Sequence, residues 1–243
     1  MVWYTQSRID LKKLFLLFLA FGSLTAQNLE PSTYLGAVVR HEYYALSYVE
    51  EYEQAEWTFH MICKDCFGAA ERKNNFRDDP SIKTTSALLS DYKGSGYDRG
   101  HLVPAGDMTI NELAMSESFY MTNMSPQSPS FNRGIWRKLE SQIRDWSNTY
   151  DTTYVVTGPI INFGFSTIGS NKVAVPQLYY KVIYFKNRQK MVAYILPNEG
   201  SKSDLSNFQV TVDEVEQKTM IDFFPSLEDA LENRLESSLI ILK

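Results

Sequence analysis

The stretch YDRGHLVPA, which runs from Tyr97 to Ala105, sets an arginine and a histidine on either side of a glycine. Side chains two residues apart on an extended chain share a face, so Arg99 and His101 are expected to point the same way. A neutral imidazole can accept a proton near pH 7, and a planar guanidinium pairs with two phosphate oxygens. The stretch therefore predicts a base beside a phosphate contact, with Asp98 bracing the turn and Gly100 allowing its backbone conformation.

Downstream lies the segment NRGIWRKLE, residues 132–140, at the start of a helical pattern. Apolar residues recur there at helical spacing, at Ile135, Leu139, Ile143 and Trp146. Asn132 precedes the pattern, and Glu140 follows two turns later, offset by about 80° at ~100° per residue. Amide and carboxylate oxygens suit Mg²⁺, which usually keeps several waters. Asn132 is therefore a candidate metal ligand, and Glu140 is a candidate for reaching the water on the metal.

These polar residues also have ordinary structural interpretations, which stay open on sequence grounds. Asn132 stands where a plain N-cap would stand, and Glu140 is typical of a solvated helix face. Asn123 lies in the turn NMSPQ at 123–127. It is a candidate substrate contact, but its amide is equally suited to holding the loop or orienting His101.

The composition favours a turnover enzyme over a protein that coats nucleic acid. The chain has 243 residues, of which 44% are hydrophobic and 14% aromatic, enough for one sizeable core. Its formal charge is −5, so phosphate contacts would depend on a local group of cations: Arg72, Arg99, Arg133, Arg137 and Lys138. Arg72 and Arg133 are candidate substrate contacts, although Arg72 is equally compatible with an ordinary surface position.

Residues 1–26 have the pattern of a secretory signal peptide. Arg8, Lys12 and Lys13 precede the apolar run 14–21, and small residues follow up to a cleavage site near Ala26. The run is short for a membrane span, and an uncleaved anchor is the alternative. Residues 27–243 would then form a single domain, secreted or periplasmic, with no stable membrane association after signal cleavage.

Cys63 and Cys66 are the only cysteines of the chain. Two thiols cannot complete a four-ligand zinc site. In an exported protein they form either a local disulfide or a pair of idle thiols. The other two histidines, His41 and His60, are expected to be structural or surface residues, which leaves His101 as the candidate base.

Periodicity and turn residues indicate an α+β fold, with a mainly antiparallel sheet core and flanking helices. Strands are expected at Tyr43–Val49, Ala55–Ile62, Tyr154–Thr157, Leu178–Phe185 and Met191–Leu196. The first two strands are expected to form a hairpin, and residues 72–96 a long ordered loop over the site. Helices are expected at 112–119, 133–146, 211–219 and 226–236, and Thr211 with Glu214 has the spacing of a capping box.

These motifs resemble the DNA/RNA non-specific endonuclease family of the ββα-metal finger superfamily. The resemblance rests on Asp98–His101, on the turn 123–127, and on Asn132 with Glu140 eight residues later. Supporting matches are Ser95–Tyr97, Thr157–Pro159 and Asp222–Pro225. The resemblance therefore extends over most of the chain, from about residue 43 to residue 227.

The resemblance implies a ββα-metal finger, with the histidine on its hairpin and the asparagine on the following helix. In that scheme His101 is the general base, Asn132 the direct ligand of one Mg²⁺ or Mn²⁺ ion, and Glu140 the catalytic residue that holds the metal's water. Arg99 and Arg72 contact the phosphate. The implied activity is hydrolysis of DNA and RNA without sequence specificity, leaving 5′-phosphate ends. A homodimer is a further expectation from the family.

Two other hypotheses compete with the nuclease. The first is a catalytically silent nucleic-acid-binding module of the same fold, which would not need His101, Asn132 and Glu140 as a set. The second is a phosphodiesterase for small nucleotides. Incubation with plasmid DNA, structured RNA and a small diester, with Mg²⁺ or a chelator, distinguishes the three.

Overall fold

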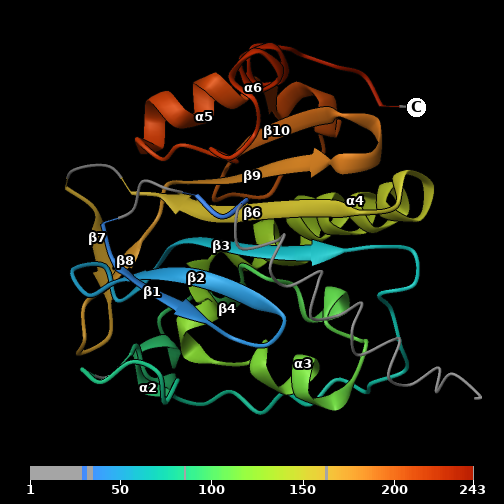
Figure 1. Ribbon diagram of the computed structural model, residues 1–243. Coiled ribbons are helices and arrows are strands. Elements are labelled where there is room, and N and C mark those ends of the chain that lie inside the picture. The colour runs from blue at the N-terminus through green and yellow to red at the C-terminus, as the bar shows by residue number, and fades with distance from the viewer. Residues whose placement is uncertain (1–28, 32–34, 85, 162–163, 243) are drawn as a thin grey trace, which may run out of the picture.

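The computed structural model describes residues 29–31, 35–84, 86–161 and 164–242. At its centre is a seven-stranded antiparallel sheet with the strand order β1-β2-β3-β6-β9-β10-β11 (Figure 1). The strands are β1 (Ala37–Arg40), β2 (Tyr44–Val49), β3 (Gln54–Ile62), β6 (Thr153–Ile160), β9 (Leu178–Phe185), β10 (Lys190–Pro197) and β11 (Gln209–Val210). The predicted hairpin is confirmed, because β2 and β3 pair antiparallel.

Alternation along the strands divides the apolar side chains between two cores, one on each face of the sheet. On β10, Val192, Tyr194 and Leu196 belong to the first core, and Met191 and Ala193 to the second. The helix α4 (Arg137–Tyr150) packs on the first face through Leu139 and Ile143. The mixture of an antiparallel sheet with helices on both faces confirms the α+β prediction.

The helices α5 (Val212–Thr219) and α6 (Asp229–Glu236) pack on the second face and lie beside β10 (Figure 1). The capping box at the start of α5 is confirmed: the Glu214 amide donates to Thr211 Oγ1 (3.2 Å), and the Thr211 amide donates to Glu214 Oε2 (3.1 Å). The last predicted helix begins later than expected, at Asp229. Its N-cap is Glu228, whose carboxylate accepts from the amides of Ala230 and Leu231.

A smaller unit is built on the first face from a hairpin and the helix that follows it. The strands β4 (Asp98–His101) and β5 (Met124–Gln127) pair antiparallel and lead through a π-type helical turn, η3 (Phe131–Trp136), into α4. The helix predicted from Arg133 is therefore regular only from Arg137. Gly134, with φ −105° and ψ −112°, leaves the helical conformation, which a glycine does more readily than other residues.

The connection between β4 and β5 contains η1 (Ala105–Asp107), α3 (Glu112–Glu117) and η2 (Met121–Asn123). α3 confirms the helix expected at 112–119, apart from its last two residues. The region 72–96 is mostly irregular, as predicted, and contains the short α2 (Leu89–Tyr92). The remaining elements are β7 (Ser166–Ile168) paired with β8 (Val173–Val175), η4 (Lys186–Arg188) and η5 (Leu205–Phe208).

Cys63 and Cys66 form a disulfide with an S–S distance of 2.04 Å, so the disulfide alternative is the correct one. The predicted signal peptide, residues 1–26, lies outside the described residues. Within the described part of the chain, no helix is both long enough and apolar enough to cross a membrane.

Candidate active site

His101 ends β4, where it lies opposite Met124 of β5. Its half-buried ring packs edge-on against two phenylalanines, with centroid distances of 4.9 Å to Phe119 and 5.8 Å to Phe76. The imidazole Nε2 is buried and has no hydrogen-bond partner within the described residues. Packing between aromatic rings therefore orients this imidazole.

Two arginines lie over these two rings, one over each. The Arg99 guanidinium lies 4.3 Å from the Phe76 centroid, and that of Arg72 lies 5.0 Å from the Phe119 centroid. Burial lowers the pKa of His101 to about 3, and the positive charges of Arg72 and Arg99 contribute in the same direction. The imidazole is therefore neutral at pH 7 and retains a lone pair that can accept a proton. The predicted association of Arg72, Arg99 and His101 is present in the structure.

Asn132 lies in η3 and is not a helix cap. Its Nδ2 donates to Asp98 Oδ2 (2.9 Å), and Arg133 binds both oxygens of the same carboxylate (2.9 and 2.6 Å). Burial alone would raise the pKa of Asp98, but the hydrogen bonds from Arg133 and Asn132 outweigh it and lower that pKa. With Nδ2 bound to Asp98, Oδ1 of Asn132 is turned away and remains available as a ligand.

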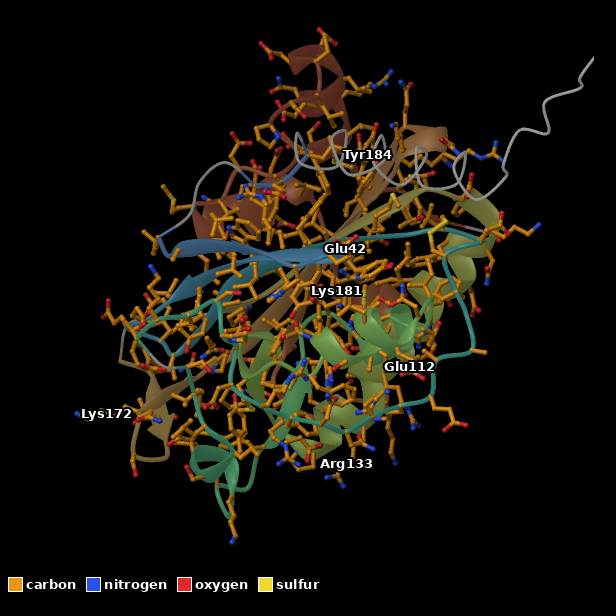
Figure 2. All side chains as sticks on the ribbon, turned by 60° about the horizontal axis from the view of Figure 1, so that its bottom comes forward. Glu42, Glu112, Arg133, Lys172, Lys181 and Tyr184 are labelled. Atoms are coloured by element: carbon orange, nitrogen blue, oxygen red, sulfur yellow. A yellow bond between two sulfur atoms is a disulfide. The ribbon has the colours of Figure 1, made fainter. Side chains whose placement is uncertain are left out.

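Arg133 itself is exposed over 70% of its side chain and lies at the molecular surface (Figure 2). Its guanidinium is bound to Asp98 in a bidentate pair, so its visible role is to hold the carboxylate that holds Asn132. A direct contact between Arg133 and substrate stays a prediction.

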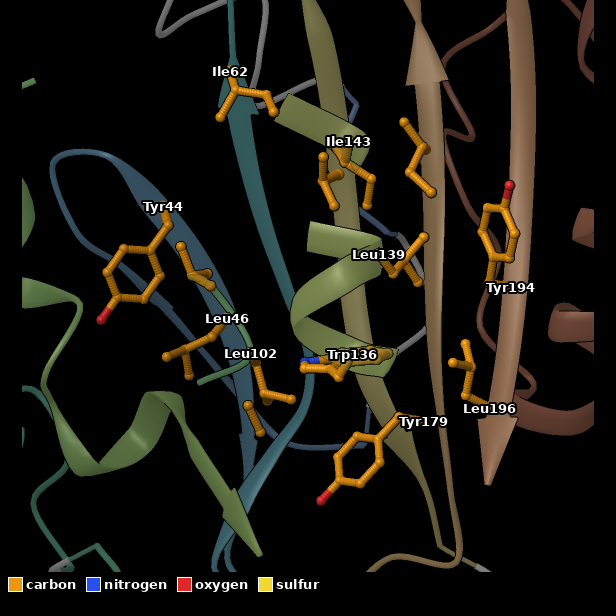
Figure 3. Packing of buried hydrophobic residues seen from close by; sticks show 14 of the residues in the cluster. Tyr44, Leu46, Ile62, Leu102, Trp136, Leu139, Ile143, Tyr179, Tyr194 and Leu196 are labelled. Carbon is orange, nitrogen blue, oxygen red and sulfur yellow. The ribbon is translucent and has the colours of Figure 1, made fainter. Parts of the chain in front are cut away.

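Glu140 lies on α4, where it faces a buried lysine from β9. The Lys181 Nζ donates to Thr157 Oγ1 (2.8 Å) and to the Leu102 carbonyl (3.5 Å), and lies 4.6 Å from the Trp136 centroid. Figure 3 shows Leu102, which follows the candidate base, close to Trp136, one turn before Glu140. Lys181, which is labelled in Figure 2, therefore contacts both the residue after His101 and Trp136, the residue before α4.

The charges of Glu140 and Lys181 act on each other's pKa. Burial raises the pKa of Glu140, and the positive charge of Lys181 opposes that shift. Burial lowers the pKa of Lys181, and Glu140 opposes it in turn. The positive charge of Arg72 also lowers the pKa of Glu140, so both Lys181 and Arg72 oppose the effect of burial on this carboxylate.

Behind Glu140 lies Asp107, which accepts from Arg144 (2.7 Å) and is hydrogen-bonded to His60 Nε2 (3.0 Å). Burial would raise the pKa of Asp107, but His60 and Arg144 lower it below its ordinary value. His41 is bound in the same manner to Asp79 (3.0 Å). Both histidines are buried partners of carboxylates, so the prediction that they are structural is confirmed.

Asn132 and Glu140 each offer an oxygen donor of the kind that suits a hard divalent cation. Asn132 offers a neutral amide oxygen fixed by Asp98, and the Glu140 carboxylate makes no hydrogen bond within the described residues. Mg²⁺ and Mn²⁺ favour such oxygens and usually retain water. These residues therefore fit the metal that the sequence predicted.

The structure corrects the prediction that Asn123 contacts substrate. Its side chain is fully buried, with Nδ2 donating to the carbonyls of Val103 (3.0 Å) and Ser118 (2.8 Å) and Oδ1 accepting from the Val103 amide (2.8 Å). All of its hydrogen-bonding groups are in use by the backbone. Asn123 therefore holds the chain that follows His101, in agreement with the alternative interpretation.

Sequence reasoning missed the residues that support the site from a distance in the chain. Phe76 and Phe119 pack against the imidazole and the two arginines, and the charge of Lys181 acts on Glu140. The only sequence signal for Lys181 was a charged residue within an otherwise apolar strand, a position where a lysine is rarely buried without a partner.

β4 and the helical segment η3–α4 thus present one imidazole, one guanidinium, an amide and a carboxylate, and Arg72 from the preceding loop adds a second guanidinium. The chain belongs to the DNA/RNA non-specific endonuclease family, whose model matches residues 25–230. The resemblance seen in the sequence motifs is therefore confirmed.

Individual relatives support this assignment. The mitochondrial nuclease EXOG of Mus musculus is 34% identical over 210 residues, which cover 78% of this chain and 57% of the relative. Nuclease C1 of Cunninghamella echinulata var. echinulata is 35% identical, covering 78% of this chain and 83% of the relative. A nuclease of a Nostoc species is 32% identical, covering 88% and 81%. The chain thus spans little more than half the length of the mouse protein.

A solved structure gives the same assignment. The crystal structure of the EndoG/EndoGI complex contains a chain that matches with a TM-score of 0.78 and 32% sequence identity. The match covers 85% of this chain and 92% of that chain. At this coverage, the likeness extends over most of the chain.

Proposed function

We propose that this chain is a metal-dependent endonuclease that hydrolyses DNA and RNA without sequence specificity and leaves 5′-phosphate ends. The observation that carries the proposal is the geometry of one strand. β4 presents His101 and Arg99 against the same aromatic ring, Phe76, and its first residue, Asp98, fixes the amide of Asn132. A binding module has no need for that combination.

The roles follow from the chemistry of each group. His101 accepts a proton from the water that attacks phosphorus, and the bond to the 3′ oxygen breaks as the new P–O bond forms. Arg99 and Arg72 pair with non-bridging oxygens and stabilise their growing charge. A divalent cation at Asn132 and Glu140 supplies further charge neutralisation for the phosphate and the departing oxygen. Groups that contact only phosphate do not distinguish sequences.

The test compares wild type with His101→Ala and Asn132→Ala on plasmid DNA, structured RNA and a small diester. Wild type should cleave both polymers with Mg²⁺ and neither in chelator. His101→Ala should lose about 10²- to 10⁴-fold in rate, the usual contribution of a general base. The control is Arg188→Ala, an exposed arginine in the η4 turn, which should keep wild-type activity.

Each outcome has a distinct meaning. Intact plasmid and RNA with Mg²⁺ would contradict the nuclease, and cleavage of the small diester alone would favour the phosphodiesterase. Cleavage that persists in chelator would overturn the metal role of Asn132. A homodimer stays a prediction, which sedimentation of the purified chain would test.

We also propose that the protein is exported to the periplasm or the medium. The support is the basic and apolar pattern of residues 8–21 together with the Cys63–Cys66 disulfide, because disulfides persist in oxidising compartments. Fractionation of cells should find the mature chain outside the cytoplasm, with an N-terminus near residue 27. A full-length chain retained in the cytoplasm would contradict export.

A further inference from the structure

The face of the sheet opposite the active site carries a group of carboxylates from two helices. Asp213 and Glu216 lie three residues apart on α5, and Glu232 and Glu236 lie four residues apart on α6. Residues at these spacings project from the same side of a helix, and like charges there are destabilising. Single carboxylate oxygens of Asp213, Glu216 and Glu236 lie within 4.8 Å of one another.

One of these carboxylates is buried without a partner. Glu236 is only 7% exposed, and its Oε1 makes no hydrogen bond within the described residues. Oε1 of Glu232 is likewise buried and without a partner there. A buried carboxylate is costly unless it is paired or binds a metal, so Glu236 itself points to a ligand between the two helices.

No compensating cation from the protein fills this role in the described structure. None of the ion pairs in the described residues joins a lysine or arginine to Asp213, Glu216 or Glu236. The known partner of Glu216 is the Phe223 amide, which donates to Oε1 at 2.9 Å. Burial raises the pKa of Glu236 to about 8, and the charge of Glu216 adds to the shift. The described residues therefore place carboxylates together here without a lysine or arginine paired to them.

We propose that Asp213, Glu216 and Glu236 form a binding site for a Ca²⁺ ion that joins α5 to α6 and stabilises the fold. Two oxygens bound to one Ca²⁺ at 2.3–2.6 Å can be at most about 5 Å apart, which matches the separation of these three. Ca²⁺ accepts several carboxylates in irregular geometry. Mg²⁺ demands octahedral geometry and gives up its water reluctantly, so it fits a set of protein carboxylates less well.

The ion at this site acts on stability, and the two helices that hold it pack on the face away from His101. α5 and α6 reach the sheet through Val212, Val215 and Leu235, and they lie beside β10 (Figure 1). Binding of Ca²⁺ to the folded state alone raises the melting temperature by mass action. The proposal is independent of the nuclease activity.

The experiment measures thermal unfolding of the chelator-treated protein in the Asn132→Ala background, which disables the proposed catalytic ion site. Ca²⁺ at about 100 times its Kd should raise Tm by roughly 5–10 °C. Glu236→Gln and Glu216→Gln should each abolish most of that shift. The control Glu51→Gln removes an exposed carboxylate from the β2–β3 turn and should leave the shift intact.

Calorimetric titration of the same background should find one Ca²⁺ per chain, and none in Glu236→Gln. Mg²⁺ should give a smaller shift than Ca²⁺. Glu236→Gln should be at least as stable as its parent in chelator, which shows that it folds. The proposal is overturned by the absence of a Ca²⁺-dependent shift, or by an equal shift in the parent and in both glutamine variants.

Discussion

The two faces of the sheet bury carboxylates in opposite surroundings. On the face that carries α4, Asp107 lies between His60 and Arg144, and Glu140 faces Lys181. On the face that carries α5 and α6, burial and the charges of other carboxylates raise the pKa of Glu236. On the first face the protein supplies its own cations beside the buried carboxylates, and on the second face the proposed Ca²⁺ ion would supply the positive charge.

The largest effect should come from removing the internal cation on the catalytic face. Lys181→Met removes the buried positive charge that opposes the effect of burial on Glu140, and a buried carboxylate left uncompensated costs about 3 kcal/mol of unfolding free energy. Urea unfolding measures the loss. The double variant Lys181→Met/Glu140→Gln should recover much of it, because neither charge is then left alone. Equal stabilities for the single and double variants would show that the two groups are not coupled.

The catalytic motif could be predicted from sequence because its chemistry is local. Arg99 and His101 share one face of a four-residue strand, and strand alternation alone places them together. Asn132 was a weaker inference, since its bond to Asp98 spans 34 positions and an N-cap explained it equally well. The hairpin, the long strands and the capping box were predictable for the same reason, because each depends on neighbouring residues.

The remaining features depend on contacts between distant segments, which no local pattern contains. The predicted angle between Asn132 and Glu140 is that of a continuous α-helix. The helix is instead interrupted near Gly134 by a π-type turn. Asn123 was a candidate contact because its backbone partners could not be known in advance. Glu216 and Glu236 lie on different helices, and each has the sequence pattern of an ordinary solvated helix residue. Only the packing of α5 on α6 brings them together.

A second test concerns the orientation of Asn132. Asp98→Ala removes the acceptor that fixes Nδ2, and loss of such a partner behind a metal ligand typically weakens metal binding 10- to 100-fold. The Mg²⁺ concentration for half-maximal cleavage should rise accordingly. Arg133→Ala, which leaves Asp98 in place, should have the smaller effect. A larger effect of Arg133→Ala would instead indicate a direct contact of that arginine with substrate.

A third test uses the pH dependence of kcat/KM, which reports the free enzyme. Burial and the two arginines hold the pKa of His101 near 3, well below its ordinary value. Neutral imidazole is the active form, so activity should fall only as pH drops toward that value. Removing a nearby cation makes imidazolium less unfavourable and raises the pKa.

The acid limb of kcat/KM should therefore move to higher pH, by about half a unit to one unit, in Arg72→Ala and in Arg99→Ala. The distant Arg188→Ala should leave it unchanged. An acid limb that stays in place in both of the first variants would show that burial alone sets the His101 pKa. The contrast between the two faces would then be smaller, because the cations beside His101 would not control the titration of its imidazole.

The smallest effect is expected on the opposite face, in protein freed of divalent ions. Glu236→Gln keeps the shape of the side chain and removes a buried charge that faces Asp213, Glu216, Asp222 and Glu232, so it should stabilise the chelated protein by about 1 kcal/mol at pH 8. Because the folded-state pKa of about 8 lies above the ordinary value, wild type binds more protons when folded. Its stability should fall as pH rises from about 4.5 to 8, with a shallower fall in the variant. A fall of equal slope in both proteins would show that another carboxylate of the group, and not Glu236, causes the pH dependence of stability.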